Sequence, residues 1–147
     1  MTAKVFVDSN ILIYAHDADA GPKQKTAAAQ IKALWEEQLG RISTQVLQEF
    51  YVTVTQKLGK PLAKSKAREI VRDYAQWVAI PTTPQTVIRA SEISEGWRLS
   101  FWDSLILAAA EEQDCSTVLT EDLNTGQTVA GIRIINPFLH NRDMPVR

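Results

Sequence analysis

The sequence predicts an α/β fold, in which helices cover both faces of a short, mostly parallel sheet of four to five strands. Short apolar runs, typical of buried strands, alternate along the chain with longer segments that carry apolar residues at helical spacing. This alternation favours parallel strands joined by right-handed crossovers. The composition, 45% hydrophobic and 22% charged, is that of an ordinary globular protein, and no repeat, low-complexity tract or linker divides it. We therefore expect a single domain over residues 1–147.

Five elements are expected in the first half of the chain. In order, they are a strand over 5–7, a helix over 11–14, a helix over 23–38, a strand over 41–43 and a helix over 44–58. Asp8 closes the first strand, and Ser9 or Asn10 is suited to cap the helix that follows. Gly21 and Pro22 separate the first two helices, since proline suits a first helical turn.

Six more elements are expected in the second half. In order, they are a helix over 64–77, a strand over 78–80, helices over 85–98 and 104–113, and strands over 117–120 and 132–135. Pro81 and Pro84 end the first of these strands, because proline cannot donate to a strand ladder. Ser100 and Asp103 have the spacing of a capping box, so Asp103 is expected in the first helical turn.

Charge and hydropathy limit the possible partners. A formal net charge of −1 gives no reason to expect generic nucleic-acid binding. One local basic stretch, in which Glu69 is the only acid, either holds RNA phosphates or is a solvated helix face; it contains Lys57, Lys60, Lys64, Lys66, Arg68 and Arg72. No segment approaches the ~20 apolar residues of a membrane span, and the N-terminus lacks a signal-peptide pattern, so we expect a cytoplasmic protein. The single cysteine, Cys115, is interpreted as a reduced core thiol.

Four acidic residues stand at positions that could meet at one edge of the sheet. Asp8 directly follows the strand predicted over 5–7, and Asp122 closely follows the strand predicted over 117–120. Asp103 lies in a first helical turn, and Glu49 lies within a helix. In open parallel sheets the functional crevice lies beyond the carboxyl ends of the strands. We therefore expect the four carboxylates to converge there.

Converging carboxylates repel one another, so they either take up protons or recruit a cation. Hard oxygen ligands favour Mg²⁺ or Mn²⁺ over zinc, and such an ion suits phosphodiester hydrolysis. We interpret all four acids as catalytic, and Asp8, Asp103 and Asp122 as metal ligands. Taken singly, each acid also has an ordinary interpretation as a cap, a turn residue or a solvated charge, and only their combination favours a site.

Neighbouring polar residues are candidates to support the metal site. If strand alternation persists past Thr120, it places Thr120 and Asp122 on one side and Glu121 on the other, which favours Asp122 as the ligand. Asn10, Thr120 and Asn124 could orient carboxylates or metal-bound water, although local capping and turn roles also fit them. Three aromatic residues are interpreted as core or dimer contacts in preference to base-stacking platforms; they are Trp97, Phe101 and Trp102.

At these positions the chain resembles the PIN-domain nucleases, and among them the VapC-type toxins of prokaryotic toxin–antitoxin pairs. The resemblance rests on four acid-bearing motifs in order and on a familiar ending. They are Val7–Leu12 (VDSNIL), Val46–Phe50 (VLQEF), Leu99–Ser104 (LSFWDS), Leu119–Asn124 (LTEDLN) followed by Gly126-Gln127, and Ile134–Phe138 (IINPF). The four motifs together are specific, although each alone is weak.

The resemblance implies a three-layer α/β/α sandwich, dependence on Mg²⁺ or Mn²⁺, and a ribonuclease site built from Asp8, Glu49, Asp103 and Asp122. It also implies a homodimer and an antitoxin protein whose tail occludes the site. PIN domains that process RNA without a toxin role are an alternative, as is a non-catalytic module with structural acids. A phosphoacceptor receiver domain fits poorly, because Asp8 is followed by Ser9 and Asn10 where a second acid is expected.

Overall fold

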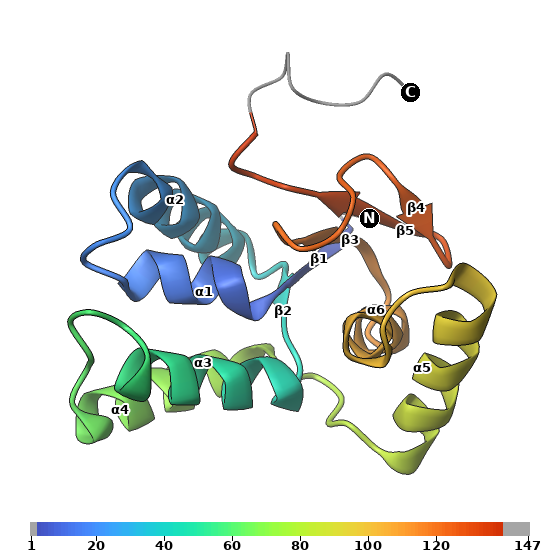
Figure 1. Cartoon of the computed structure of the whole chain (residues 1–147), viewed down its shortest axis with the longest axis horizontal. Helices are drawn as coiled ribbons and strands as arrows, with labels where there is room; N and C mark the ends of the chain where they lie inside the picture. The colour runs from blue at the N-terminus through green and yellow to red at the C-terminus, as the bar shows by residue number, and fades with distance from the viewer. Residues whose placement is uncertain (1–2, 140–147) are drawn as a thin grey trace.

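The computed structural model describes residues 3–139, and in them one five-stranded sheet is flanked by helices (Figure 1). The strands are β1 Lys4–Val7, β2 Gly40–Arg41, β3 Cys115–Leu119, β4 Thr128–Val129 and β5 Ile132–Ile135. Their order in the sheet is β2-β1-β3-β5-β4. All neighbours are parallel except the antiparallel pair of β4 and β5. The predicted α/β class with a mostly parallel sheet is confirmed.

Six α-helices and one 3₁₀ turn connect these strands in the described part of the chain. They are α1 Ser9–His16, α2 Pro22–Glu37, α3 Thr44–Gln56, α4 Lys64–Tyr74, η1 Ala75–Trp77, α5 Pro84–Trp97 and α6 Phe101–Glu112. Helix α1 packs against α2 and α3, α3 packs against α4, and α5 packs against α6, as the paired ribbons in Figure 1 show. The result is a three-layer α/β/α sandwich. None of the helices among residues 3–139 is long and apolar enough to cross a membrane.

The core lies between the central strands and the helices that cover them. Phe6, Val118 and Ile134, from three adjacent strands, are fully buried. Helix α6 is buried along residues 104–110, where three successive alanines let it lie close to its neighbours. Each large apolar side chain buried in this way contributes roughly 1.5–3 kcal/mol to folding. Cys115 is also buried, which confirms the predicted core thiol, and burial raises its pKa to about 12.

Residues 78–80 do not form the predicted strand. They follow η1, and the backbone N–H groups of Ala79 and Ile80 donate to Oε1 of Gln113 (2.8 and 3.3 Å) in place of a neighbouring strand. The backbone N–H groups of this apolar run are thus satisfied by a side chain from a distant part of the chain. A hydropathy pattern does not reveal such a partner.

Strand β4 was not expected, and it forms a short hairpin with β5. Its two residues are joined to β5 by Ala130 and Gly131, both with positive φ (51° and 81°). That backbone is the one a tight two-residue hairpin requires, but Ala-Gly is a weak sequence signal for it compared with Asn-Gly.

Two of the three aromatic residues singled out in the sequence lie at the surface. Trp97 is 45% exposed and Trp102 is 65% exposed, so the core interpretation is wrong for both. Phe101 is half-buried and packs against the core. Contact with a second subunit stays a prediction for the two tryptophans.

Candidate active site

Asp8 lies where β1 ends and α1 begins. Its N–H donates to the carbonyl of Leu119 (3.0 Å), which extends the pairing of β1 with β3 by one residue. The backbone of Asp8 is extended (φ −72°, ψ 158°), and its Oδ1 accepts a hydrogen bond from the N–H of Ser9 (2.7 Å). Asp8 is therefore the N-cap of α1, and the prediction that Ser9 or Asn10 caps this helix is wrong because both are already helical.

A hydrogen-bond network joins Asp8 to Asp122. The hydroxyl of Thr120 donates to Oδ2 of Asp8 (2.8 Å) and accepts from the N–H of Asp122 (3.1 Å). The amide nitrogen of Asn10 lies 3.0 Å from Oδ2 of Asp122, 3.3 Å from Oγ1 of Thr120 and 3.4 Å from Oδ2 of Asp8. Asn10 and Thr120 thus hold the two carboxylates on the same side of the sheet, beyond β1 and β3.

Glu49 approaches this network from α3. The hydroxyl of Ser9 donates to Oε1 of Glu49 (3.0 Å), and the negative charge of Glu49 acts on Asp8. Glu49 itself is exposed. The hydrogen bond from Ser9 to Glu49 was not predicted from the sequence, because a serine beside a helix start indicates only a helix cap. The packing of α1 on α3, which creates the contact, carries no local sequence signal.

The position of Asp8 is electrostatically unfavourable for an ionised carboxylate. The pKa of Asp8 is raised to about 6, mainly because the side chain is buried. The negative charges of Glu49 and Asp122 make smaller contributions in the same direction. Hydrogen bonds from Thr120 and from the N–H of Ser9 act in the opposite direction, because they stabilise the ionised form. A positive charge placed beside Asp8 and Asp122 would remove the repulsion.

Asp103 and Asn124 are less closely tied to the network. Asp103 lies in the first turn of α6, and its N–H donates to Oγ of the N-cap Ser100 (3.1 Å). The reciprocal half of the expected capping box is not formed, and the Asp103 carboxylate makes no hydrogen bond to other residues among 3–139. Asn124 is exposed in a turn, where its carbonyl accepts from the N–H of Gln127 (3.2 Å). The structure therefore does not join its side chain to Asp122.

Glu121 and Asp122 have different partners, as predicted, although both lie beyond the end of β3 at Leu119. Its carboxylate forms an ion pair with Lys23 (2.8 Å) and accepts a hydrogen bond from the hydroxyl of Tyr14. Burial acts to raise the pKa of Glu121, but the bonds from Lys23 and Tyr14 outweigh it and hold the pKa below its usual value. Glu121 is thus already neutralised by a lysine, whereas Asp122 has no ion-pair partner among the described residues.

The donor set fits a magnesium-like ion. Among residues 3–139, no group of three or more His, Cys, Asp or Glu side chains is gathered closely enough to hold an ion by protein ligands alone. Mg²⁺ does not need such a cage, because it retains several waters and commonly binds one or two carboxylates. Asp8 and Asp122, linked through Asn10, offer two hard oxygen donors of the kind that Mg²⁺ and Mn²⁺ prefer.

Two adjoining hollows lead from this site across α3 toward α4. The first, about 410 Å³, is lined by Ser9, Gln48, Glu49, Val52, Thr53 and Lys57. The second, about 350 Å³, is lined by Leu47, Gln48, Tyr51, Val52, Arg68 and Val71. Gln48 and Val52 border both hollows, which together we call the α3 groove. Glu49 and Lys57 line its first hollow, and Arg68 lines its second.

Comparison with known proteins places the fold. The family model of the PIN domain matches residues 5–128. A toxin–antitoxin complex from Klebsiella pneumoniae is similar, with 17% identity, a TM-score of 0.66, and coverage of 92% of this chain and 98% of that one.

Two further solved structures share the fold, whereas no curated protein matches the sequence. DNA-bound VapBC from Salmonella typhimurium has 18% identity and a TM-score of 0.63, over 90% of this chain and 97% of that one. The sarcin–ricin loop cleaving toxin VapC20 of Mycobacterium tuberculosis has 18% identity and a TM-score of 0.57, over 81% and 90%. At these identities the likeness establishes a common fold.

Proposed function

Because this chain belongs to the PIN-domain family, we propose that it is a metal-dependent endoribonuclease and the toxin of a type II toxin–antitoxin pair. The observation that carries the proposal is the buried carboxylate of Asp8, which shares Asn10 with Asp122 beyond the carboxyl ends of β1 and β3. Parallel α/β sheets bind their ligands at this edge. Two facing carboxylates without a lysine or arginine partner suit a cation there.

Asp8 and Asp122 would hold Mg²⁺ or Mn²⁺. Asp103, in the first turn of α6, stays a predicted third ligand, because the structure does not gather its carboxylate with the other two. When bound, such an ion polarises the scissile phosphate and lowers the pKa of the attacking water. Asn10 and Thr120 keep the Asp8 and Asp122 carboxylates in place through their hydrogen bonds.

The remaining acid, Glu49, completes the proposed catalytic set. Its Oε1 is held by the hydroxyl of Ser9, while its exposed position leaves the carboxylate open to solvent and substrate. Asp8 must lose its proton before it can act as a ligand, and its pKa of about 6 means that this proton is largely absent at neutral pH. The site is therefore ready for a cation under cytoplasmic conditions, where we place the protein.

The α3 groove is the proposed path of the RNA strand. It starts at Glu49, and Lys57 and Arg68 supply positive charge along it. Tyr51 in its second half offers a ring against which a base can stack. With a net charge of −1 on the whole chain, binding of RNA has to rely on such local cations.

The toxin assignment is supported by the kind of protein that shares the fold over nearly its full length. The similar chains from Klebsiella pneumoniae and Salmonella typhimurium were solved as toxin–antitoxin and VapBC complexes, and this chain covers 98% and 97% of them. By analogy we propose an antitoxin protein as partner and a homodimer as the working unit.

Cleavage of RNA by purified protein tests the proposed activity. With Mg²⁺ or Mn²⁺ the wild type should cleave, and with a chelator it should not. Asp8→Asn and Asp122→Asn remove a ligand charge with little change of shape, so each should lower the cleavage rate by at least about 100-fold. Glu121→Gln is the matched control, because its carboxylate serves Lys23 and Tyr14; it should cleave at nearly the wild-type rate. Full activity in Asp8→Asn or in chelator would refute the mechanism.

A further inference from the structure

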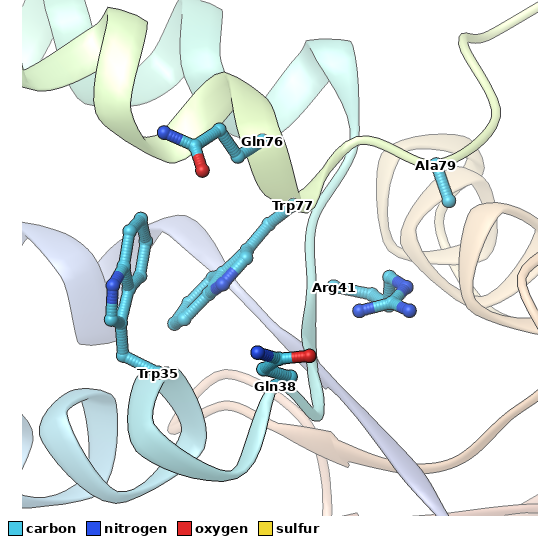
Figure 2. A pocket seen from close by; sticks show the side chains of 6 residues that line it. All are labelled: Trp35, Gln38, Arg41, Gln76, Trp77 and Ala79. Atoms are coloured by element: carbon cyan, nitrogen blue, oxygen red, sulfur yellow. The ribbon is translucent and has the colours of Figure 1, made fainter.

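A further cavity, of about 360 Å³, shares no lining residue with the α3 groove. It is lined by Trp35, Gln38, Arg41, Gln76, Trp77 and Ala79 (Figure 2). Gly40 and Arg41 form the edge strand β2, in which Arg41 pairs with Phe6 of β1. Asp8 and Asp122 lie beyond the carboxyl ends of β1 and β3. None of the four acids lines the cavity.

Arg41 has unused hydrogen-bonding capacity at this cavity. A guanidinium carries five N–H donors, yet the protein bond that Arg41 makes is from Nη1 to the carbonyl of Gly40 (2.7 Å). Its Nε is buried without a partner, and no ion pair within residues 3–139 includes Arg41. A partly buried cation with unsatisfied donors is unfavourable until an anion accepts from it.

Aromatic rings and amides surround the guanidinium. Figure 2 shows the rings of Trp35 and Trp77 beside each other, Arg41 on the far side of Trp77, and the amides of Gln38 and Gln76 below and above. The two indole centroids are 5.1 Å apart, and Trp35 remains 38% exposed. Planar rings can stack on the accessible Trp35 indole, whereas Trp77 is only 5% exposed and serves as a wall. Amides donate to and accept from the edges of nucleobases.

Glycine at position 40 makes this arrangement possible. A Cβ atom there would come within 2.6 Å of the Trp77 ring, so any larger residue would push the indole away from β2. The close approach of Trp77 to the sheet edge keeps one wall of the cavity in place. The Trp77 wall and Arg41 of β2 are thus part of the fold, while Gln38 and Gln76 are exposed residues of the cavity lining.

We infer that this cavity binds a mononucleotide, with its phosphate on Arg41 and its base against the exposed ring of Trp35. The guanidinium recognises phosphate oxygens, to which it can donate two parallel hydrogen bonds. The volume falls in the range of about 300–1,000 Å³ that small-ligand sites occupy. Gln38 and Gln76 would contact the base or the ribose.

Nuclear magnetic resonance of the full chain tests this inference, with adenosine 5′-monophosphate as the probe and a chelator present to exclude metal-mediated binding at Asp8. The side-chain amide signals of Gln38 and Gln76 should shift in a saturable way, and that of Asn10 should stay in place. Adenosine and inorganic phosphate, added separately, should each bind more weakly than the nucleotide, because each makes only half of the contacts.

Variants then assign the contacts. Arg41→Gln should weaken nucleotide binding by about tenfold or more, as expected for loss of a charge-assisted pair, whereas Arg72→Gln, an exposed arginine on α4, should not. Trp35→Leu, at an exposed ring, should weaken binding of nucleotide and adenosine but leave phosphate binding unchanged. The inference is overturned if the Gln38 and Gln76 signals of the wild type do not respond, if only Asn10 responds, or if phosphate alone binds as tightly as the nucleotide.

Discussion

Asp8 is buried and lies near the exposed carboxylates of Glu49 and Asp122, so its ionised form is disfavoured before any cation binds. The folded protein holds the Asp8 proton up to a pKa of about 6, whereas the unfolded chain releases it near the ordinary value of 3.8. Between these values the folded state binds more protons than the unfolded state, and stability therefore rises as the pH falls through 6 toward 4. Above pH 6 this contribution is lost.

Comparison of wild type with Asp8→Asn isolates this effect. Asparagine does not titrate, so groups that do not interact with Asp8 cancel when the two unfolding free energies are subtracted. In metal-free buffer we expect the stability advantage of Asp8→Asn over wild type to shrink by up to about 3 kcal/mol between pH 7 and pH 4. Urea unfolding at both pH values measures it. A difference that does not change with pH would mean that Asp8 is ionised without cost.

The element that matters most for substrate is α3, because it presents Glu49 and borders the α3 groove. If Lys57 and Arg68 hold RNA phosphates, changing both to glutamine should reduce the slope of log affinity against log salt by about 1.4. Binding of single-stranded RNA by fluorescence anisotropy at several salt concentrations gives the slope. The matched control neutralises Lys25 and Lys32, two exposed lysines of α2, and should leave it unchanged. Equal salt-dependence slopes in all three proteins would mean that the basic stretch is a solvated helix face that does not contact RNA.

Most elements follow from local sequence signals, and those that do not depend on distant partners. The strand at β3 and the helix at α6 were predictable because a buried apolar run and a capping serine mark them. The segment over 78–80 looked like a strand, but its amide groups are satisfied by Gln113, more than thirty positions away. Strand β4 is only two residues long, too short for any periodicity to register.

The candidate site was also predictable only where local sequence signals mark it. Acids at strand ends could be expected to converge, but the contact that unites them, from Asn10 to Asp122, spans 112 positions and depends on the order of strands in the sheet. The role of Ser9 in holding Glu49 depends on how α1 crosses α3. Packing geometry of this kind has no periodic sequence signal. Alternation predicted different sides for Glu121 and Asp122, although β3 ends at Leu119 and both residues lie in the bend that follows it.

At the scale of the whole molecule, we expect a dimer that covers Trp102. This side chain is 65% exposed and adjoins Asp103, a costly position for an indole in a monomer. Analytical ultracentrifugation should give a dimer for the wild type. Trp102→Glu should give a folded monomer, because the glutamate would lose its contact with water in the dimer interface but stays solvated in the monomer. A matched change of the exposed Val52 on α3 to Glu should leave the dimer intact, and a monomeric wild type would contradict the expectation.

The central claim is that Asp8 and its neighbouring carboxylates hold a divalent cation. Calorimetric titration of the metal-free protein with Mn²⁺ at pH 7.5, without RNA, tests it most directly, because Asp8 is then ionised and no substrate contributes ligands. We predict saturable binding by the wild type and by Glu121→Gln, and loss of that binding in Asp8→Asn. A wild type that binds no Mn²⁺, or an Asp8→Asn protein that binds it equally well, would contradict the claim.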